Sequence, residues 1–182
     1  MSRIGKMPIT VPAGVTVNIQ QNEITVKGPK GELRRRLHPD MMIALDNNTL
    51  TVSRPSDGRI HRSLHGLTRT LVANMIEGVT KGFERELELV GVGFRTEKAG
   101  DKLVLRVGFT HPVEVAPLPG VSLNAEGGRI KVSGINKETV GEMAAYIRAI
   151  HPPDHYKGKG IRYSGETVHV KPGKTGKTVE GK

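Results

Sequence analysis

The amino-acid sequence predicts an α+β protein built from two similar small domains, each an antiparallel sheet packed against one helix. Three observations indicate this fold class: short runs in which apolar and polar residues alternate, turn signals between the runs, and an internal repeat of the whole pattern. Leu103 lies 79 residues after Ile24, and Ile130 lies 80 after Leu50, as expected for a duplicated domain. The corresponding runs are 23–28 with 49–53 and 102–108 with 129–133.

The first domain is predicted to span residues 1–81 and to contain several strands and one helix. Apolar residues alternate with polar ones through 15–19 and 23–26, as in half-buried strands. Ser56 or Asp57 is placed to cap the helix, because a side-chain oxygen there can accept from the unpaired N–H groups of the first turn. The residues at helical spacing that should form its buried stripe are Ile60, Leu64, Leu67, Leu71, Val72, Met75, Ile76 and Val79.

The second domain is predicted to span 82–170, with the joint at Lys81–Gly82. Its helix should begin after Asn136, which serves as the N-cap, and must end before Pro152 because proline cannot continue a helix. After the helix, Val168 and Val170 could form a short strand. Residues 171–182 form a basic tail that cannot bury a core, so we expect it to be disordered without RNA. The buried face of the helix is predicted at Val140, Ala144, Ile147 and Ile150.

The charge distribution predicts a polyanionic partner. The chain has a net charge of +10 and no cysteine, which excludes disulfides and thiolate zinc sites. Residues 84–150 contain nine basic and nine acidic residues, whereas both flanking segments are net positive. This asymmetry favours nucleic acid over a merely basic soluble protein. With no apolar run of about 20 residues and no apolar signal-peptide core, we expect a cytoplasmic protein without a membrane partner.

The sequence contains no motif that supports catalysis or metal binding. Gly173–Thr178 resembles the end of a P-loop, but Lys171 occupies the position of the first glycine. His61 and His65 share a helix face, yet Arg62 stands where a metalloprotease helix needs glutamate. No serine lies in a nucleophile elbow. We therefore predict no enzymatic activity, no cofactor and no metal.

The strongest RNA-binding signal follows the second helix. Lysines alternate there with glycines, which allow the backbone to approach phosphates closely. The Tyr156 and Tyr163 rings and the Arg162 guanidinium could stack on unpaired bases or sugars, but both tyrosines, and Tyr163 above all, are better interpreted as anchors of the loop. Arg3 and Lys6 lie on an N-terminal arm, and the first helix adds a basic face for which a solvated surface is the alternative. The full candidate set is Tyr156, Lys157, Gly158, Lys159, Gly160, Arg162, Lys171, Lys174, Lys177, Arg3, Lys6, Arg62, His65 and Arg69.

Three stretches, 2–15, 63–70 and most specifically 156–163, resemble the family of the sixth protein of the bacterial large ribosomal subunit, the L-six family. The resemblance runs from residue 2 to about 172. It places the family's RNA-binding stretch on residues 156–160 and Arg162. The chain departs from the family pattern at two positions that bear on how it enters this loop: the family would have arginine at His151 and proline at His155.

The resemblance implies two similar α+β domains without catalytic activity. It implies binding to large-subunit (23S-type) ribosomal RNA near its 3′ end, close to the sarcin–ricin loop and to the stalk base where translation factors dock. Neighbouring large-subunit proteins are implied partners, and no homo-oligomer is expected. Two other classes remain as alternatives. A DNA-binding architectural protein would need a groove-reading helix or wedge residues, whereas the basic residues here lie mainly in loops and tails. A basic enzyme would need an unrecognised site.

Overall fold

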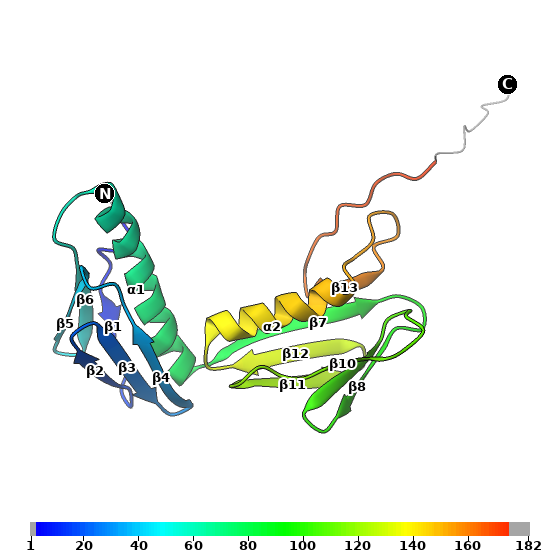
Figure 1. The fold of residues 1–182 in the computed structure, drawn as a ribbon, viewed down its shortest axis with the longest axis horizontal. Helices are drawn as coiled ribbons and strands as arrows, with labels where there is room; N and C mark the ends of the chain where they lie inside the picture. Colours follow the sequence, from blue (N-terminus) through cyan, green and yellow to red (C-terminus); the bar gives the residue numbers. More distant parts are fainter. Residues whose placement is uncertain (1–2, 175–182) are drawn as a thin grey trace. The chain divides into compact units, whose positions relative to one another are not determined.

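The computed structural model describes residues 3–174, which fold into two compact units (Figure 1). The first unit contains the chain up to Phe83 together with Ser133–Val140. The second contains Glu84–Val132 and the chain from Gly141 onward. The boundary between the two units therefore lies two residues after the joint expected at Lys81–Gly82. The short segment Ser133–Val140, which comes later in the chain, belongs to the first unit by its contacts.

The first unit contains two three-stranded sheets, in the orders β2-β3-β4 and β1-β6-β5, and one helix. The strands pair antiparallel, with Val26 of β3 opposite Val17 and Leu33 of its two neighbours. The strand runs expected at 23–28 and 49–53 are confirmed. The elements are β1 (Ile9–Thr10), β2 (Thr16–Gln20), β3 (Glu23–Gly28), β4 (Gly31–Arg36), β5 (Met42–Asp46), β6 (Thr49–Ser53) and α1 (Arg59–Thr80).

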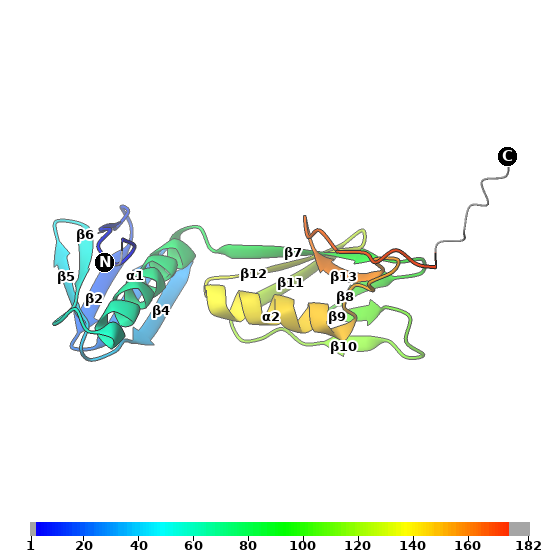
Figure 2. The same ribbon diagram turned by 90° about the horizontal axis from the view of Figure 1, so that it is seen from above.

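The second unit repeats this topology and adds one strand. The order β8-β9-β10 corresponds to β2-β3-β4, and β7-β12-β11 corresponds to β1-β6-β5. The predicted duplication is therefore confirmed, and β13 at the edge of β7 has no counterpart among the described residues of the first unit (Figures 1 and 2). The elements are β7 (Phe83–Val90), β8 (Arg95–Ala99), β9 (Lys102–Arg106), β10 (Val113–Val115), β11 (Val121–Glu126), β12 (Arg129–Gly134), α2 (Lys137–Ile150) and β13 (Gly160–Tyr163).

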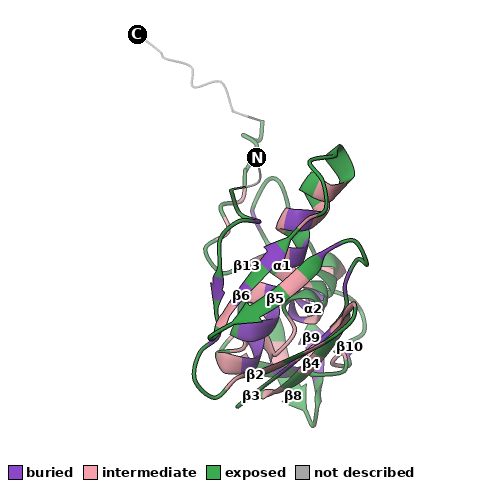
Figure 3. Cartoon of the chain, turned by 90° about the vertical axis from the view of Figure 1, so that its left-hand side faces the viewer, coloured by how far each residue is buried: buried purple, intermediate pink, exposed green. Residues whose placement is uncertain are grey.

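Aliphatic side chains form the core of each unit, as the scarcity of aromatic residues requires. Figure 3 shows the buried residues in purple, and in the first unit they include residues of α1 and of strands β3 and β6, which α1 contacts. Ile24, Leu50 and Val72 are fully enclosed there. The enclosed side chains of the second unit include Leu87, Leu103, Leu105, Ile130, Met143, Ile147 and Ile161.

The buried face of α1 differs from the predicted stripe. Ile60 and Leu67 are 69% and 54% exposed, whereas His65 and Thr68 are buried. The His65 Nε2 atom lies 2.8 Å from the Val52 carbonyl oxygen, so this polar ring is hydrogen-bonded inside the core. The predicted buried face is therefore wrong in the first turns of α1. The sequence pattern assigns core positions to apolar residues, but a polar residue can occupy such a position when it is hydrogen-bonded.

The start of α1 also differs from prediction. Gly58 is the N-cap, and no side chain caps the helix. The Asp57 carboxylate instead pairs with Arg54 at 2.6 Å, and the Ser56 hydroxyl lies 2.7 Å from the His61 ring. Both expected caps are engaged elsewhere, and the helix begins with its first N–H groups free of a side-chain acceptor.

The bounds of α2 agree with prediction. The Asn136 Oδ1 atom accepts from the Glu138 N–H at 3.0 Å, as an N-cap does, and the helix ends at Ile150, before the two prolines. The strand considered at Val168 and Val170 is absent from the described part of the chain, where residues 165–174 have no strand. β13 forms earlier, at Gly160–Tyr163.

Two truncations on α1 test which of its faces supports the core. Ile76→Ala should lower the free energy of unfolding by about 2–5 kcal/mol, because it leaves a cavity at a buried site. Leu67→Ala should change it by no more than about 0.5 kcal/mol, because Leu67 is exposed. Urea unfolding followed by circular dichroism measures both. Equal losses would contradict the observed orientation of α1.

Candidate nucleic-acid interface

The RNA-binding motif read from the sequence is half loop and half strand. Its second half is β13, which pairs antiparallel with β7 and places Ile161 opposite Leu89. The Ile161 side chain is fully buried. The motif is therefore fixed at one end in the sheet and core of the second unit, and only its first half forms a loop.

Arg162 lies in β13 and not in the loop. Its guanidinium is 3.3 Å from a carboxylate oxygen of Glu88, the residue opposite it on β7, and its side chain is about one-third exposed. The Ser164 hydroxyl also donates to Glu88, at 3.3 Å. The sequence analysis placed Arg162 among the cations of the loop. In the structure, its guanidinium instead pairs with Glu88 within the sheet.

Asp154 closes the loop that precedes β13. Its Oδ2 atom accepts from the N–H groups of Tyr156 at 3.2 Å and Lys157 at 2.9 Å. Its own N–H donates to the Lys159 carbonyl, and its carbonyl accepts from the Gly158 N–H. These backbone donors, Lys157 first, hold the pKa of the Asp154 carboxyl below its ordinary value. Asp154 therefore stays ionised and holds the loop in one shape at neutral pH.

The two glycines of the motif serve the fold. Gly158 has φ +65 and is buried. Gly160 has φ +148, and a Cβ atom there would lie 2.6 Å from the Pro152 carbonyl oxygen. The sequence interpretation assigned both glycines to close approach by phosphates. Their conformational freedom instead allows the loop to turn and to pack against the prolines after α2.

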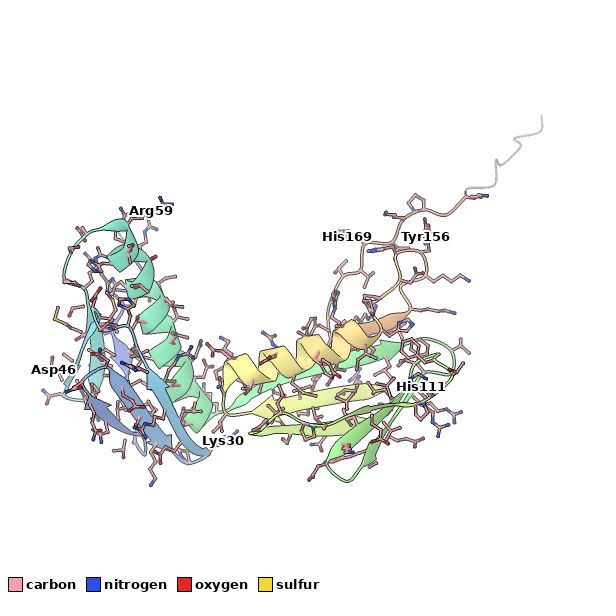
Figure 4. The ribbon with its side chains drawn as sticks, viewed as in Figure 1. Lys30, Asp46, Arg59, His111, Tyr156 and His169 are labelled. Atoms are coloured by element: carbon pink, nitrogen blue, oxygen red, sulfur yellow. The ribbon has the colours of Figure 1, made fainter. Side chains whose placement is uncertain are left out.

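The loop and the following segment present exposed cations. Tyr156 is 61% exposed, and Lys157 and Lys159 beside it are exposed. The Lys171 N–H donates to the His155 carbonyl at 2.7 Å, so the segment after β13 lies against the loop; Figure 4 labels Tyr156 and His169 on these neighbouring segments. Within residues 3–174, no ion pair involves the exposed lysines of this region, which are Lys157, Lys159, Lys171 and Lys174.

Tyr163 anchors the end of the motif, as the sequence favoured. Its ring is half-buried and lies 5.7 Å from the Arg148 guanidinium carbon. Arg148 in turn pairs with Glu166 at 2.6 Å, and Glu166 accepts from the Tyr163 N–H at 2.9 Å. Arg148, and secondly the Tyr163 N–H, hold the pKa of Glu166 below its ordinary value. This contact fixes the end of β13 to α2.

The remaining candidates within the described residues lie on the first unit. Arg3, Lys6 and Arg62 are exposed, and both Lys6 and Arg62 act electrostatically on Asp57. Arg69 donates to the carbonyls of Met7 and Pro8, so it holds the N-terminal segment against α1.

The prediction that His65 lies on an exposed basic face is wrong, because His65 is only 4% exposed and packs beneath Gly5. It belongs to the core in this structure and does not contribute to an exposed basic face. Lys177 lies outside the described residues.

Several basic residues of the sheets are neutralised within the protein. Arg34 pairs with Glu23, Lys102 with Glu114, and Lys131 with Glu84. The strand position predicted for Arg34–Arg36 is confirmed, with side chains alternating between faces. Other strand cations, such as Arg95 and Arg106, are exposed and have no ion pair within residues 3–174. The loop and the segment after β13 differ from the sheets in that all of their exposed lysines lack an ion pair within the described residues.

The described residues give no support for other site chemistries. Residues 3–174 contain no group of three His, Cys, Asp or Glu side chains arranged to hold a metal ion. In the same part of the chain, neither helix is long and apolar enough to cross a membrane.

The second copy of this duplicated α+β fold therefore presents exposed lysines on a loop that Asp154 closes. The family model described as ribosomal protein L6 matches residues 11–82 and 90–164, one match for each copy of the repeat. The chain belongs to the ribosomal protein L6 family. Family membership confirms the prediction of a structural ribosomal protein, not an enzyme.

Individual relatives match over nearly the whole chain. The large ribosomal subunit protein uL6 of Shouchella clausii is 58% identical over 97% of this chain and 100% of its own length. The proteins of the same name from Caldicellulosiruptor bescii and Halalkalibacterium halodurans are 55% and 54% identical, over 97% of this chain and 98% and 100% of their own lengths.

Removing the Asp154 carboxylate tests whether it shapes the loop. In Asp154→Ala, the amide hydrogens of Tyr156 and Lys157 should exchange with solvent faster, because they lose their acceptor. Hydrogen exchange followed by NMR measures this, and Asp101→Ala, a change in a distant exposed turn, is the control. In the unchanged protein, a depressed pKa means that the carboxylate contribution is present above the unfolded value of 3.8 and is lost as pH falls through the lower folded value. Unchanged exchange in Asp154→Ala would contradict this role.

Proposed function

We propose that this chain is a structural constituent of the large ribosomal subunit in the cytoplasm, and that it binds the large-subunit ribosomal RNA through residues 156–159 and the segment that follows β13. The observation that carries the proposal is the set of four exposed lysines, none of them in an ion pair within residues 3–174, on the loop and on the segment whose Lys171 N–H donates to the loop. The names of the relatives support the choice of subunit.

The mechanism is electrostatic and geometric. Lys157 and Lys159 replace counterions condensed on the RNA phosphates, and the released counterions drive binding. Asp154 and the buried glycines fix the loop before RNA arrives, so little conformational entropy is lost on binding. Lys171 and Lys174 extend the same positive surface along the chain. Tyr156, exposed at the loop tip, is available to stack on an unpaired base or a sugar.

The proposal also includes the place on the large-subunit RNA at which this chain binds. The resemblance of residues 156–163 to the L-six family supports a site near the 3′ end of the large-subunit RNA, close to the sarcin–ricin loop and the stalk base. Neighbouring large-subunit proteins and docking translation factors would then be nearby. Arg3, Lys6 and Arg62 supply secondary phosphate contacts from the first unit, and Lys177 adds a positive charge in the C-terminal tail.

Co-sedimentation tests the assignment to the subunit. When a tagged form of the chain is expressed in a bacterium, it should sediment in sucrose gradients with large subunits and with whole ribosomes, and it should be absent from free small subunits. Immunoblotting of the gradient fractions measures this. Protein that remains at the top of the gradient while large subunits sediment would refute the ribosomal assignment.

Salt dependence tests the loop directly. Replacing both Lys157 and Lys159 with alanine should weaken binding to purified bacterial large-subunit RNA. It should also reduce the log–log salt slope by about 1.4–1.8, because each lost phosphate contact removes about 0.7–0.9. Filter binding from 50 to 300 mM KCl measures the slope.

The matched control for this experiment replaces Lys102 and Lys131, two lysines of the same unit that pair with carboxylates. This double variant should keep the original slope, because neither charge is available to a phosphate. A loop variant with the slope of the unchanged protein would show that residues 156–159 do not contact the RNA.

A further inference from the structure

A cleft of about 830 Å³ opens in the second unit beside the RNA-binding loop. It is lined by Phe109, by Arg148 and Ile150 at the end of α2, by residues 151–155 after the helix, and by residues 166–169 after β13. Its volume lies within the range of roughly 300–1,000 Å³ that is typical of small-molecule sites. Nothing in the electrostatic mechanism above uses this cleft.

Aromatic rings form one wall of the cleft. Phe109 is 47% exposed, although it is one of only three phenylalanines in the chain. Its ring centroid lies 5.9 Å from that of His151 and 6.3 Å from that of His111, which is stacked on it. Phe94 contacts the other side of His151, edge to face, at 5.1 Å. The packed rings hold His151 in place and leave part of the Phe109 surface open.

The polar groups of the cleft are already engaged or closed off. Arg148 pairs with Glu166, and Asp154 accepts from the loop. The His151 Nδ1 atom is buried and presents no accessible surface to the cleft. The exposed part of the Phe109 ring is therefore the surface that a ligand in the cleft would contact.

The cleft adjoins the proposed RNA-binding surface. His155 and His169 are exposed on its rim, and Lys157 follows His155 by two residues. Lys171 follows His169 and donates its N–H to the His155 carbonyl. A polynucleotide backbone held by Lys157 and Lys171 would therefore run past the mouth of the cleft.

We propose that the cleft receives one unpaired nucleobase of the bound RNA, stacked on Phe109. This inference rests on the proposed RNA-binding function. A nucleobase is flat and has hydrogen-bonding groups at its edge, and it is attached to the anionic backbone that the neighbouring lysines attract. Proteins bind unpaired bases by stacking them on aromatic side chains and hydrogen-bonding their edges.

The decisive experiment compares Phe109→Ala with Tyr146→Ala, which removes an exposed ring of the same unit from outside the cleft. Filter binding to purified bacterial large-subunit RNA should show affinity reduced about 5- to 150-fold for Phe109→Ala, the value of one base stack. The salt slope should be unchanged, because stacking releases no counterions. Tyr146→Ala should bind as the unchanged protein does.

One further variant guards against misfolding of Phe109→Ala. Thr167→Trp fills the cleft from an exposed position and should weaken binding as Phe109→Ala does. Circular dichroism confirms that each variant is folded.

The outcomes separate this proposal from the function on which it rests. If the folded cleft variants bind RNA with unchanged affinity while the Lys157 and Lys159 double variant loses salt slope, the RNA-binding function stands and the nucleobase proposal is overturned. A lower slope in Phe109→Ala, or an equal loss in Tyr146→Ala, also overturns it. If the unchanged protein fails to bind large-subunit RNA, the proposed function fails and this inference fails with it.

Discussion

The pairing of β13 with the edge of β7 is the interaction on which the functional part of this molecule depends. The first copy of the duplicated fold has no such strand. In the second copy, Ile161 enters the core, Arg162 pairs with Glu88, and Tyr163 packs by Arg148. These three contacts belong to consecutive residues of one short strand. They convert a segment after a proline-terminated helix, which would otherwise be a free linker, into a loop held at both ends.

This anchoring separates two kinds of basic residue that are indistinguishable in composition. Some basic side chains on strands pair with carboxylates, as Arg34 does with Glu23, so their charges are neutralised within the protein. Others, such as Arg95 opposite Arg106, have no ion pair within residues 3–174. Residues on the closed loop have no strand opposite them, so Lys157 and Lys159 remain exposed without ion pairs in the described structure. Exposed pairs contribute little to stability, but they decide which charges remain available to a polyanion.

Much of the fold could be predicted from the sequence, because the duplication and the strand alternation are properties of spacing. The site was predictable only in part. Asp154 was missed as the acceptor that closes the loop, although an aspartate before a turn is a known signal. The glycines were interpreted as facing RNA, whereas Gly160 is buried against Pro152, a contact that depends on tertiary packing. His65 entered the candidate set because helical spacing cannot reveal a core partner such as the Val52 carbonyl.

The structure also bears on how a protein so poor in aromatic residues could recognise unpaired RNA. Both cores are aliphatic, which leaves two of the three phenylalanines, Phe94 and Phe109, free to pack around His151. If cohesion were the sole role of these rings, full burial of Phe109 would stabilise the protein more. Its open face lowers stability in the free protein, and this cost is offset in a complex where a base covers the ring. On this view, the lysines provide affinity for any RNA, and the aromatic cleft adds a preference for RNA with an unpaired base at one position.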